Sequence, residues 1–315
     1  MAHTLLLSGA LTMLLSVVPS ADAVPVTPVA QAAEVAPRAD AAADAELAPA
    51  ADASPRLASS VRVPTPAGVV LLPAGFGATN GAYDVVVHFH GAAESVEPAF
   101  AASGLRAAMI DVNLGNGSGP YEDRYARPGA LDDVLGVVVR VARQHGIEGN
   151  VGRIALSSWS AGYGGVTRLL FQPGVAERVD TILLADGLHA GFAPLGYRKI
   201  QEILLAPYVR FAERAARGEA MFAITHSSIH TPSYASTTET ARYLAAAVGA
   251  ERAETHAVGP RGMKELYRAS RGGFVATGYE GTTPEAHCDH LRAIGKTLWP
   301  ELAARWSGGA RTDHP

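Results

Sequence analysis

Cysteine is nearly absent from this chain, because Cys288 is the only one among 315 residues. A single cysteine cannot form an intramolecular disulfide, so no covalent cross-link of that kind can stabilise the fold. The lack of a cysteine near the amino terminus also excludes a lipid anchor attached to a cysteine behind an export signal. Stability must come from a hydrophobic core, and 48% hydrophobic residues in a chain of this length can form a sizeable one.

An excess of positive charge is also missing. Lys and Arg total 26 against 30 Asp and Glu, and the formal net charge is −4. Proteins that bind nucleic acid usually carry a basic surface, so this balance argues against nucleic acid as a partner. The apolar run at the amino terminus is too short to span a bilayer comfortably, and no second apolar stretch is long enough to cross one, so we expect no stable membrane span.

The amino terminus has the pattern of an export signal. An apolar run, Leu5–Val18, is followed by Ala21-Asp22-Ala23, a small-x-small pattern that predicts cleavage before Val24. The residues before the run include no Lys or Arg, so the terminal amine supplies the positive charge, and a buried amino-terminal helix is the alternative. We predict a signal peptide over 1–23 and a secreted or periplasmic protein.

The next segment, 24–60, is rich in Ala, Pro and Asp and contains almost no large apolar side chain. It cannot bury enough surface to offset the entropy lost on ordering, which predicts a disordered tether. A folded domain is expected over 61–306, followed by a flexible tail over 307–315.

Within the expected domain, apolar runs typical of strands alternate with segments of helical periodicity. Tyr83–Phe89 is a run typical of a strand buried on both faces, whereas Leu131–His145 repeats its apolar residues at helical spacing. This alternation predicts an α/β fold, a three-layer sandwich with a mostly parallel central sheet of about eight strands. Strands are expected near 61–63, 68–72, 83–89, 107–112, 153–157, 179–185, 220–225 and 273–278, and the closing helix over 291–306.

A serine lies at the apex of one predicted strand-to-helix turn. Ser158-Trp159-Ser160-Ala161-Gly162 directly follows the apolar run Arg153–Leu156 and precedes a helical stretch, 163–171. Such an apex is strained and needs small residues two positions before and after it, as Ser158 and Gly162 are. The pattern resembles the nucleophile elbow of the α/β-hydrolase superfamily, with serine in place of the commoner first glycine. A turn whose small residues only allow close packing is the alternative.

The resemblance implies a nucleophile, a carboxylate and a histidine base in that chain order. Ser160, Asp186 and His287 follow this order. Asp186 comes at the end of an apolar strand, and His287 is expected on a loop that runs into the closing helix. His290, one helical turn later, is the alternative base.

Asp186 also has a structural interpretation, in which its side chain only stabilises the turn that it lies in. Two further carboxylates are alternatives to it as the acid. The superfamily usually supplies the acid after the seventh strand, where this chain has no carboxylate before Glu239. A known variation places the acid after the sixth strand, as Asp186 would be. Glu239 and Asp289 therefore stay open as candidates.

The resemblance also implies an oxyanion hole. His90-Gly91-Ala92 follows the expected strand 83–89 as the His-Gly loop of the superfamily follows its strand. The amides of Ala92 and Ala161 would donate hydrogen bonds to the oxyanion, and Gly91 would let the backbone come close to the substrate.

The implied function is a secreted serine hydrolase that cleaves a small-molecule or lipid carboxylic ester through an acyl-enzyme, without a cofactor. A peptidase or amidase is the alternative within the superfamily. The segment 187–196 and the helix expected over 197–217 are candidates for a small lid.

Two other classes of function stay open. A zinc-dependent hydrolase could use the histidine-rich loops, and a non-catalytic binding module could have the same fold. The candidate zinc ligands are His88, His90, Asp186, His189, His226, His230, His287 and His290.

Overall fold

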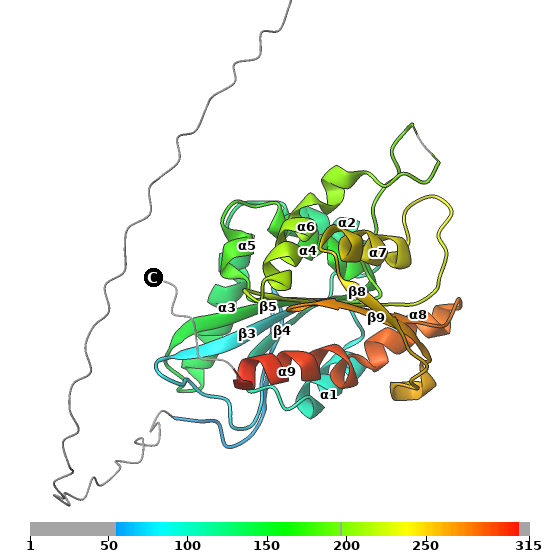
Figure 1. The fold of residues 1–315 in the computed structure, drawn as a ribbon. Helices are drawn as coiled ribbons and strands as arrows, with labels where there is room; N and C mark the ends of the chain where they lie inside the picture. The colour runs from blue at the N-terminus through cyan, green and yellow to red at the C-terminus, as the bar shows by residue number, and fades with distance from the viewer. Residues whose placement is uncertain (1–54, 196, 309–315) are drawn as a thin grey trace, which may run out of the picture. The chain divides into compact units, whose positions relative to one another are not determined.

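The structure is a computed structural model that describes residues 55–195 and 197–308 (Figure 1). The predicted signal peptide, residues 24–54 of the predicted tether and residues 309–315 of the predicted tail lie outside the described residues. Residues 55–60, which we assigned to the tether, contact the domain: the Leu57 amide donates to the Phe76 carbonyl at 2.8 Å. The part of the chain that packs on the domain therefore begins before residue 61.

The elements of the described residues follow the alternation that the sequence predicts. Their bounds are β1 (Val61–Thr65), β2 (Gly68–Leu72), β3 (Ala82–Phe89), α1 (Ala93–Ala102), β4 (Ala108–Val112), α2 (Gly119–Tyr125), α3 (Ala130–Gln144), β5 (Asn150–Trp159), α4 (Tyr163–Leu170), α5 (Val175–Arg178), β6 (Thr181–Ala185), α6 (Glu202–Ala216), β7 (Met221–His226), α7 (Thr237–Ala247), β8 (Glu251–Glu254), β9 (Glu265–Arg271), β10 (Phe274–Tyr279), α8 (Pro284–Arg292) and α9 (Leu298–Gly308). None of these helices has both the length and the apolar character that a membrane crossing needs.

The strands of the described residues form one sheet in the order β1-β2-β4-β3-β5-β6-β7-β10-β9-β8. The six central strands, β4-β3-β5-β6-β7-β10, are parallel to one another, whereas β1 and β2 at one edge and β9 and β8 at the other pair antiparallel. Helices α3 to α7 cover one face, and α1, α8 and α9 cover the other (Figure 1). The predicted three-layer α/β fold with a mostly parallel sheet is thereby confirmed.

Two strands at one edge are additional to the eight that the sequence predicts. The residues of β8 are all exposed, and three of its four side chains are charged. The next strand, β9, is exposed at Arg271 and buried at only two positions, Tyr267 and Ala269. Edge strands of this kind lack the continuous apolar run that marks a buried strand, which explains why we missed them.

The closing helix differs from the prediction because it is two helices. The first, α8, begins at Pro284, where the Thr283 hydroxyl caps the helix by accepting a hydrogen bond from the Ala286 amide. Proline at the first position of a helix and threonine before it both favour a start there. His287 therefore lies in the first turn of α8 and not on a loop before the helix.

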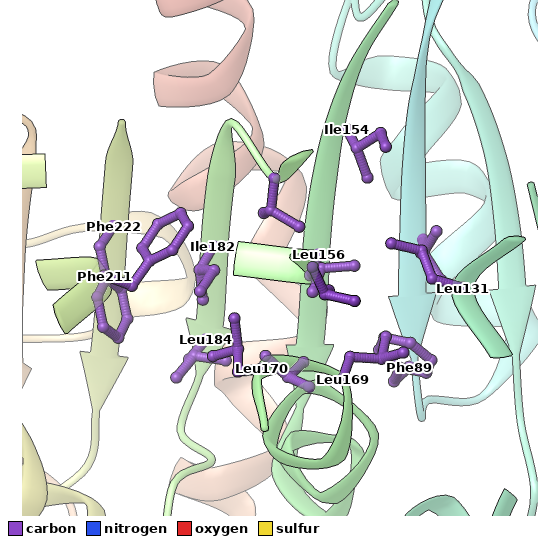
Figure 2. Packing of buried hydrophobic residues seen from close by; sticks show 14 of the residues in the cluster. Phe89, Leu131, Ile154, Leu156, Leu169, Leu170, Ile182, Leu184, Phe211 and Phe222 are labelled. Carbon is purple, nitrogen blue, oxygen red and sulfur yellow. The ribbon is translucent and has the colours of Figure 1, made fainter. Parts of the chain in front are cut away.

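Apolar side chains from both layers fill the spaces beside the sheet. Along β3, Val85, Val87 and Phe89 point to the layer that contains α3 and α4, while Val86 belongs to the core on the other face. Figure 2 shows Leu169 and Leu170 of α4 lying against the strands that carry Phe89, Leu156 and Leu184. Each such side chain contributes about 1.5–3 kcal/mol when fully buried.

Helix α6 also belongs to this layer, because its Tyr208 and Phe211 are buried in the core (Figure 2 labels Phe211). The sequence offered this helix as part of a small lid. The other part of that prediction, the segment 187–196, stays a prediction, and its residue 196 lies outside the described residues.

Gly162 is expected to tolerate no side chain. A Cβ atom at this position would lie 2.1 Å from the carbonyl oxygen of Phe89, so strand β3 or helix α4 would have to move. We expect Gly162→Ala to lower the free energy of unfolding by about 1–3 kcal/mol, as measured by urea denaturation.

Gly136→Ala is the matched control. Gly136 lies inside α3, where an added Cβ would meet only the Arg140 guanidinium, at 3.5 Å. This variant should gain about 1 kcal/mol from helix propensity. Equal stabilities of the two variants would contradict the close contact at Gly162.

Candidate active site

Ser160 lies at a strained turn between β5 and α4. Its φ is +47°, a left-handed conformation that few residues other than glycine adopt. A short 3₁₀ turn, Ser160–Gly162, joins the strand to the helix. The backbone of the turn lies so close to the backbone after β6 that only small residues fit between them. A Cβ at Gly187, for example, would lie 2.4 Å from the Ser160 carbonyl oxygen.

Three of the predicted site residues meet in one chain of hydrogen bonds. The Ser160 Oγ atom lies 2.7 Å from His287 Nε2, and His287 Nδ1 lies 2.7 Å from Asp186 Oδ2. In the sequence, Ser160 lies 127 residues before His287, and Asp186 lies 101 residues before it. Parallel strands bring them together, because β5, β6 and β10 end at the same edge of the sheet.

Asp186 is buried and held from two sides. Only 3% of the residue is exposed, its φ is +43°, and its Oδ1 atom accepts a hydrogen bond from the Ser227 amide at 2.9 Å. Burial alone would raise the pKa of this carboxyl, but the hydrogen bond with His287, the neighbouring His290 and the Ser227 amide lower it below its ordinary value. Asp186 is therefore a carboxylate at neutral pH.

The alternative base has other partners. His290 is buried in α8, and its Nδ1 atom lies 2.9 Å from Thr225 Oγ1. Burial lowers the pKa of His290 to about 4, so the ring is neutral at physiological pH. The structure thus places His287, and not His290, beside Ser160.

The two alternative carboxylates are also bound elsewhere. Glu239 pairs with Arg198 at 2.6 Å and caps helix α7 through Ser236. Asp289 lies on α8 and pairs with Arg261 and Arg292 on the protein surface. Both residues stabilise loops and helix ends, whereas Asp186 contacts the imidazole of His287.

The predicted oxyanion residues lie at the same edge of the sheet. Phe89, the last residue of β3, is the register partner of Ser158 on β5, so the loop that follows β3 lies beside the serine turn. Gly91 has a φ of +148°, and a Cβ there would lie 2.6 Å from Val96. Ala92 is the N-cap residue of α1, and Ala161 directly follows Ser160.

Trp159 connects these two parts of the site, and the sequence analysis missed it. Its indole stacks on the His90 ring at a centroid distance of 5.0 Å and on the His287 ring at 4.8 Å. The indole N–H also donates to the His287 backbone carbonyl at 3.1 Å. Its position directly before Ser160 is the only sequence signal that could have drawn attention to it.

Three of the other candidate zinc ligands contact separate partners, and the fourth lies at the surface. His88 contacts Ser157, His189 contacts the Ala235 carbonyl, His226 contacts Tyr267, and His230 is exposed. Across residues 55–195 and 197–308, no group of three or more His, Cys, Asp or Glu side chains is arranged to hold a metal ion.

The order of the strands and the position of Ser160 between β5 and α4 show that the domain has the α/β-hydrolase fold. No protein-family model and no curated protein matches the chain. Among solved structures, the chain is similar to an acylaminoacyl peptidase from Pyrococcus horikoshii, with 11% identity and a TM-score of 0.41. The match covers 81% of this chain and 42% of the peptidase, so this chain spans less than half of that protein.

Two smaller enzymes are matched over most of their length. A carboxylesterase from Bacillus subtilis has 10% identity and a TM-score of 0.39, with 80% of this chain and 92% of the esterase covered. A poly(3-hydroxybutyrate) depolymerase from Bordetella parapertussis has 15% identity and a TM-score of 0.40, with coverage of 81% and 92%.

The structural role of Glu239 predicts a pH-dependent stability. Burial would raise its pKa, but Arg198 and Ser236 lower it from 4.5 to about 2. A carboxyl with a lowered pKa stabilises the fold above its unfolded pKa, and this contribution is lost as the pH falls through the folded value. Glu239→Gln should cost roughly 1–2 kcal/mol at pH 7, and the difference from wild type should shrink between pH 4.5 and 2.

Urea denaturation at several pH values measures this difference. Glu202→Gln, at an exposed position in the first turn of α6, is the control and should show little pH-dependent change. A constant gap between wild type and Glu239→Gln down to pH 2 would contradict the role given to the ion pair.

Proposed function

We propose that this protein is a serine hydrolase that cleaves a carboxylic ester of a small molecule or lipid through an acyl-enzyme. The observation that carries the proposal is the pair of 2.7 Å hydrogen bonds that connect Ser160, His287 and Asp186. A serine hydroxyl is a weak nucleophile until a base takes its proton, and an imidazole held by a carboxylate is the usual base.

In the proposed reaction, neutral His287 carries its proton on Nδ1, which donates to Asp186, and Nε2 accepts the proton of Ser160. The serine oxygen attacks the carbonyl carbon, and the carbonyl electrons move to an oxyanion that accepts hydrogen bonds from the amides of Ala92 and Ala161. Collapse of this intermediate breaks the C–O bond, and the alcohol leaves with the proton from Nε2. Water then attacks the acyl-enzyme by the same route and releases the acid.

The charge of Asp186 supports this assignment of protons. Because its pKa is lowered, the carboxylate stays ionised while the imidazole next to it gains a proton. An ionised partner holds the required tautomer and stabilises the imidazolium that forms. Export is the second part of the proposal, and it rests on the sequence pattern of residues 1–23.

Ser160→Ala tests the nucleophile. We expect turnover of p-nitrophenyl esters to fall roughly 10⁵- to 10⁶-fold with little change in the unfolding midpoint, because alanine removes only the hydroxyl. A fluorophosphonate probe should label the wild-type protein at Ser160 and leave the variant unlabelled. Hydrolysis by the alanine variant would remove serine from the mechanism.

Controls in the same assay separate the alternatives. Activity that survives EDTA supports the serine mechanism, whereas loss of activity with EDTA would favour a zinc hydrolase. Esters of graded chain length assayed beside peptide amides distinguish an esterase from a peptidase or amidase. A wild-type protein that neither labels nor turns over any of these would favour a binding module.

The identity of the acid is tested by removing the charge of Asp186 and, in a separate variant, that of the alternative carboxylate Asp289. Asp186→Asn should lower kcat about 10³- to 10⁴-fold, because an amide can favour the wrong tautomer of His287. Asp289→Asn, two residues along the same helix from His287, should leave kcat within a factor of about two, because its partners are surface arginines. Similar losses in the two variants would contradict the assignment.

A further inference from the structure

The loop that would carry the oxyanion amide is strained and has to be held in place. His90 has a φ of +69° and Gly91 a φ of +148°, so two consecutive residues depart from the usual backbone conformations. A strained backbone at a non-glycine residue persists only where its surroundings impose it. The side chains that contact this loop therefore decide where the Ala92 amide points.

Asn113, the residue after β4, contacts the backbone of this loop directly. Its Nδ2 atom donates to the Gly91 carbonyl at 2.8 Å, and its Oδ1 atom accepts from the Gly115 amide at 3.1 Å. The second bond determines which side-chain atom is which, because only the oxygen can accept from an N–H group. The NH₂ group is thus the one that faces Gly91.

The contact to Gly91 orients the proposed oxyanion donor through the peptide plane. The Gly91 carbonyl and the Ala92 amide belong to one peptide unit, which is planar and trans, so its C=O and N–H groups point in opposite directions. Fixing the carbonyl towards Asn113 therefore fixes the Ala92 N–H on the opposite side. Rotation of this unit would move the donor away from the oxyanion.

Tyr121 of α2 completes the support. Its hydroxyl lies 2.9 Å from His90 Nδ1 and accepts from the Leu114 amide at 2.9 Å, and its one proton has two acceptors in reach, Asn113 Oδ1 at 3.2 Å and the Gly115 carbonyl at 3.3 Å. The side chain is fully buried, and burial lowers the pKa of His90, whose neutral ring can donate to the phenol oxygen. One hydroxyl thus connects His90 with Asn113.

We infer that Asn113 and Tyr121 are positioning residues that hold the Ala92 amide at the oxyanion, an inference that rests on the proposed function. Neither residue would touch the reacting atoms. Because the contribution of an oxyanion donor depends on its direction, loss of either support should lower kcat more than it changes KM.

Tyr121→Phe and Asn113→Ala test the inference in the full-length protein. The concentration of active sites is titrated with a fluorophosphonate, and kcat is expressed per labelled Ser160. We expect kcat to fall roughly 10- to 100-fold in each variant with KM within about threefold. The affinity for a boronic acid, which mimics the tetrahedral intermediate, should fall by the same factor as kcat/KM.

Tyr125→Phe is the matched control. Tyr125 lies on the same helix and is 1% exposed, and its hydroxyl makes none of the contacts to His90, Leu114 and Asn113 that the Tyr121 hydroxyl makes. Its kcat per labelled site should stay within twofold of wild type. A purely structural role for Tyr121 would reduce the number of active sites and leave kcat per site unchanged.

The outcomes separate this inference from the function on which it rests. If wild type labels at Ser160 and turns over esters, but both variants keep its kcat and its affinity for the boronic acid, the inference fails alone. Absence of labelling and turnover in wild type would remove the proposed function and the inference together. If Asn113→Ala does not fold, the inference is tested by comparing kcat per labelled site in Tyr121→Phe with that in Tyr125→Phe. Equal values in these two variants would contradict the inference.

Discussion

The left-handed backbone of Ser160 is the constraint on which the rest of the site depends. It reverses the chain between β5 and α4 within three residues. A turn this tight brings neighbouring backbones very close together, and it forms only where they leave room for one another. Gly162 leaves room for the end of β3, and Gly187 leaves room for the serine itself. The hydrophobic layers hold these backbones at that distance, so packing in the core and the direction of one hydroxyl are coupled.

His290 and Asp186 are neighbours at the edge of the sheet that carries the site, and both are buried, but the first is uncharged and the second is ionised. His290 is surrounded by the core and bonds to a neutral hydroxyl, so burial keeps it uncharged. Asp186 is equally buried, but hydrogen bonds from His287 and the Ser227 amide outweigh the cost of burying its charge. Depth alone does not decide the charge of a buried group, because the donors around it decide whether the ionised form is favoured.

Local patterns in the sequence were sufficient for the central part of the fold. The apolar run of β3, the helical spacing in α3 and the small residues around Ser160 each follow from steric and burial rules within a few residues. The edge strand β8 could not be predicted in this way, because an exposed, charged strand has no burial pattern and forms only where a neighbour offers its backbone. The start of α8 was missed although Thr283 and Pro284 mark it.

In the candidate site, too, some residues could be predicted from the sequence and others could not. Ser160, Asp186 and His287 were selected because their residue types and order match a known arrangement. The contacts of Tyr121, Asn113 and Trp159 join segments that only the folded sheet brings together, and no spacing in the sequence indicates them.

The indole of Trp159 also limits how His287 can move. One face of the imidazole is covered, so a swing out of its plane would break the stack, whereas a tilt within that plane slides the ring across the indole at little cost. In the proposed reaction, the ring must take a proton from the serine and hand it to a departing alcohol a short distance away. With the indole 4.8 Å away and inclined by 29°, an edgewise movement of the imidazole would keep this contact during the transfer, whereas a turn towards solvent would lose it.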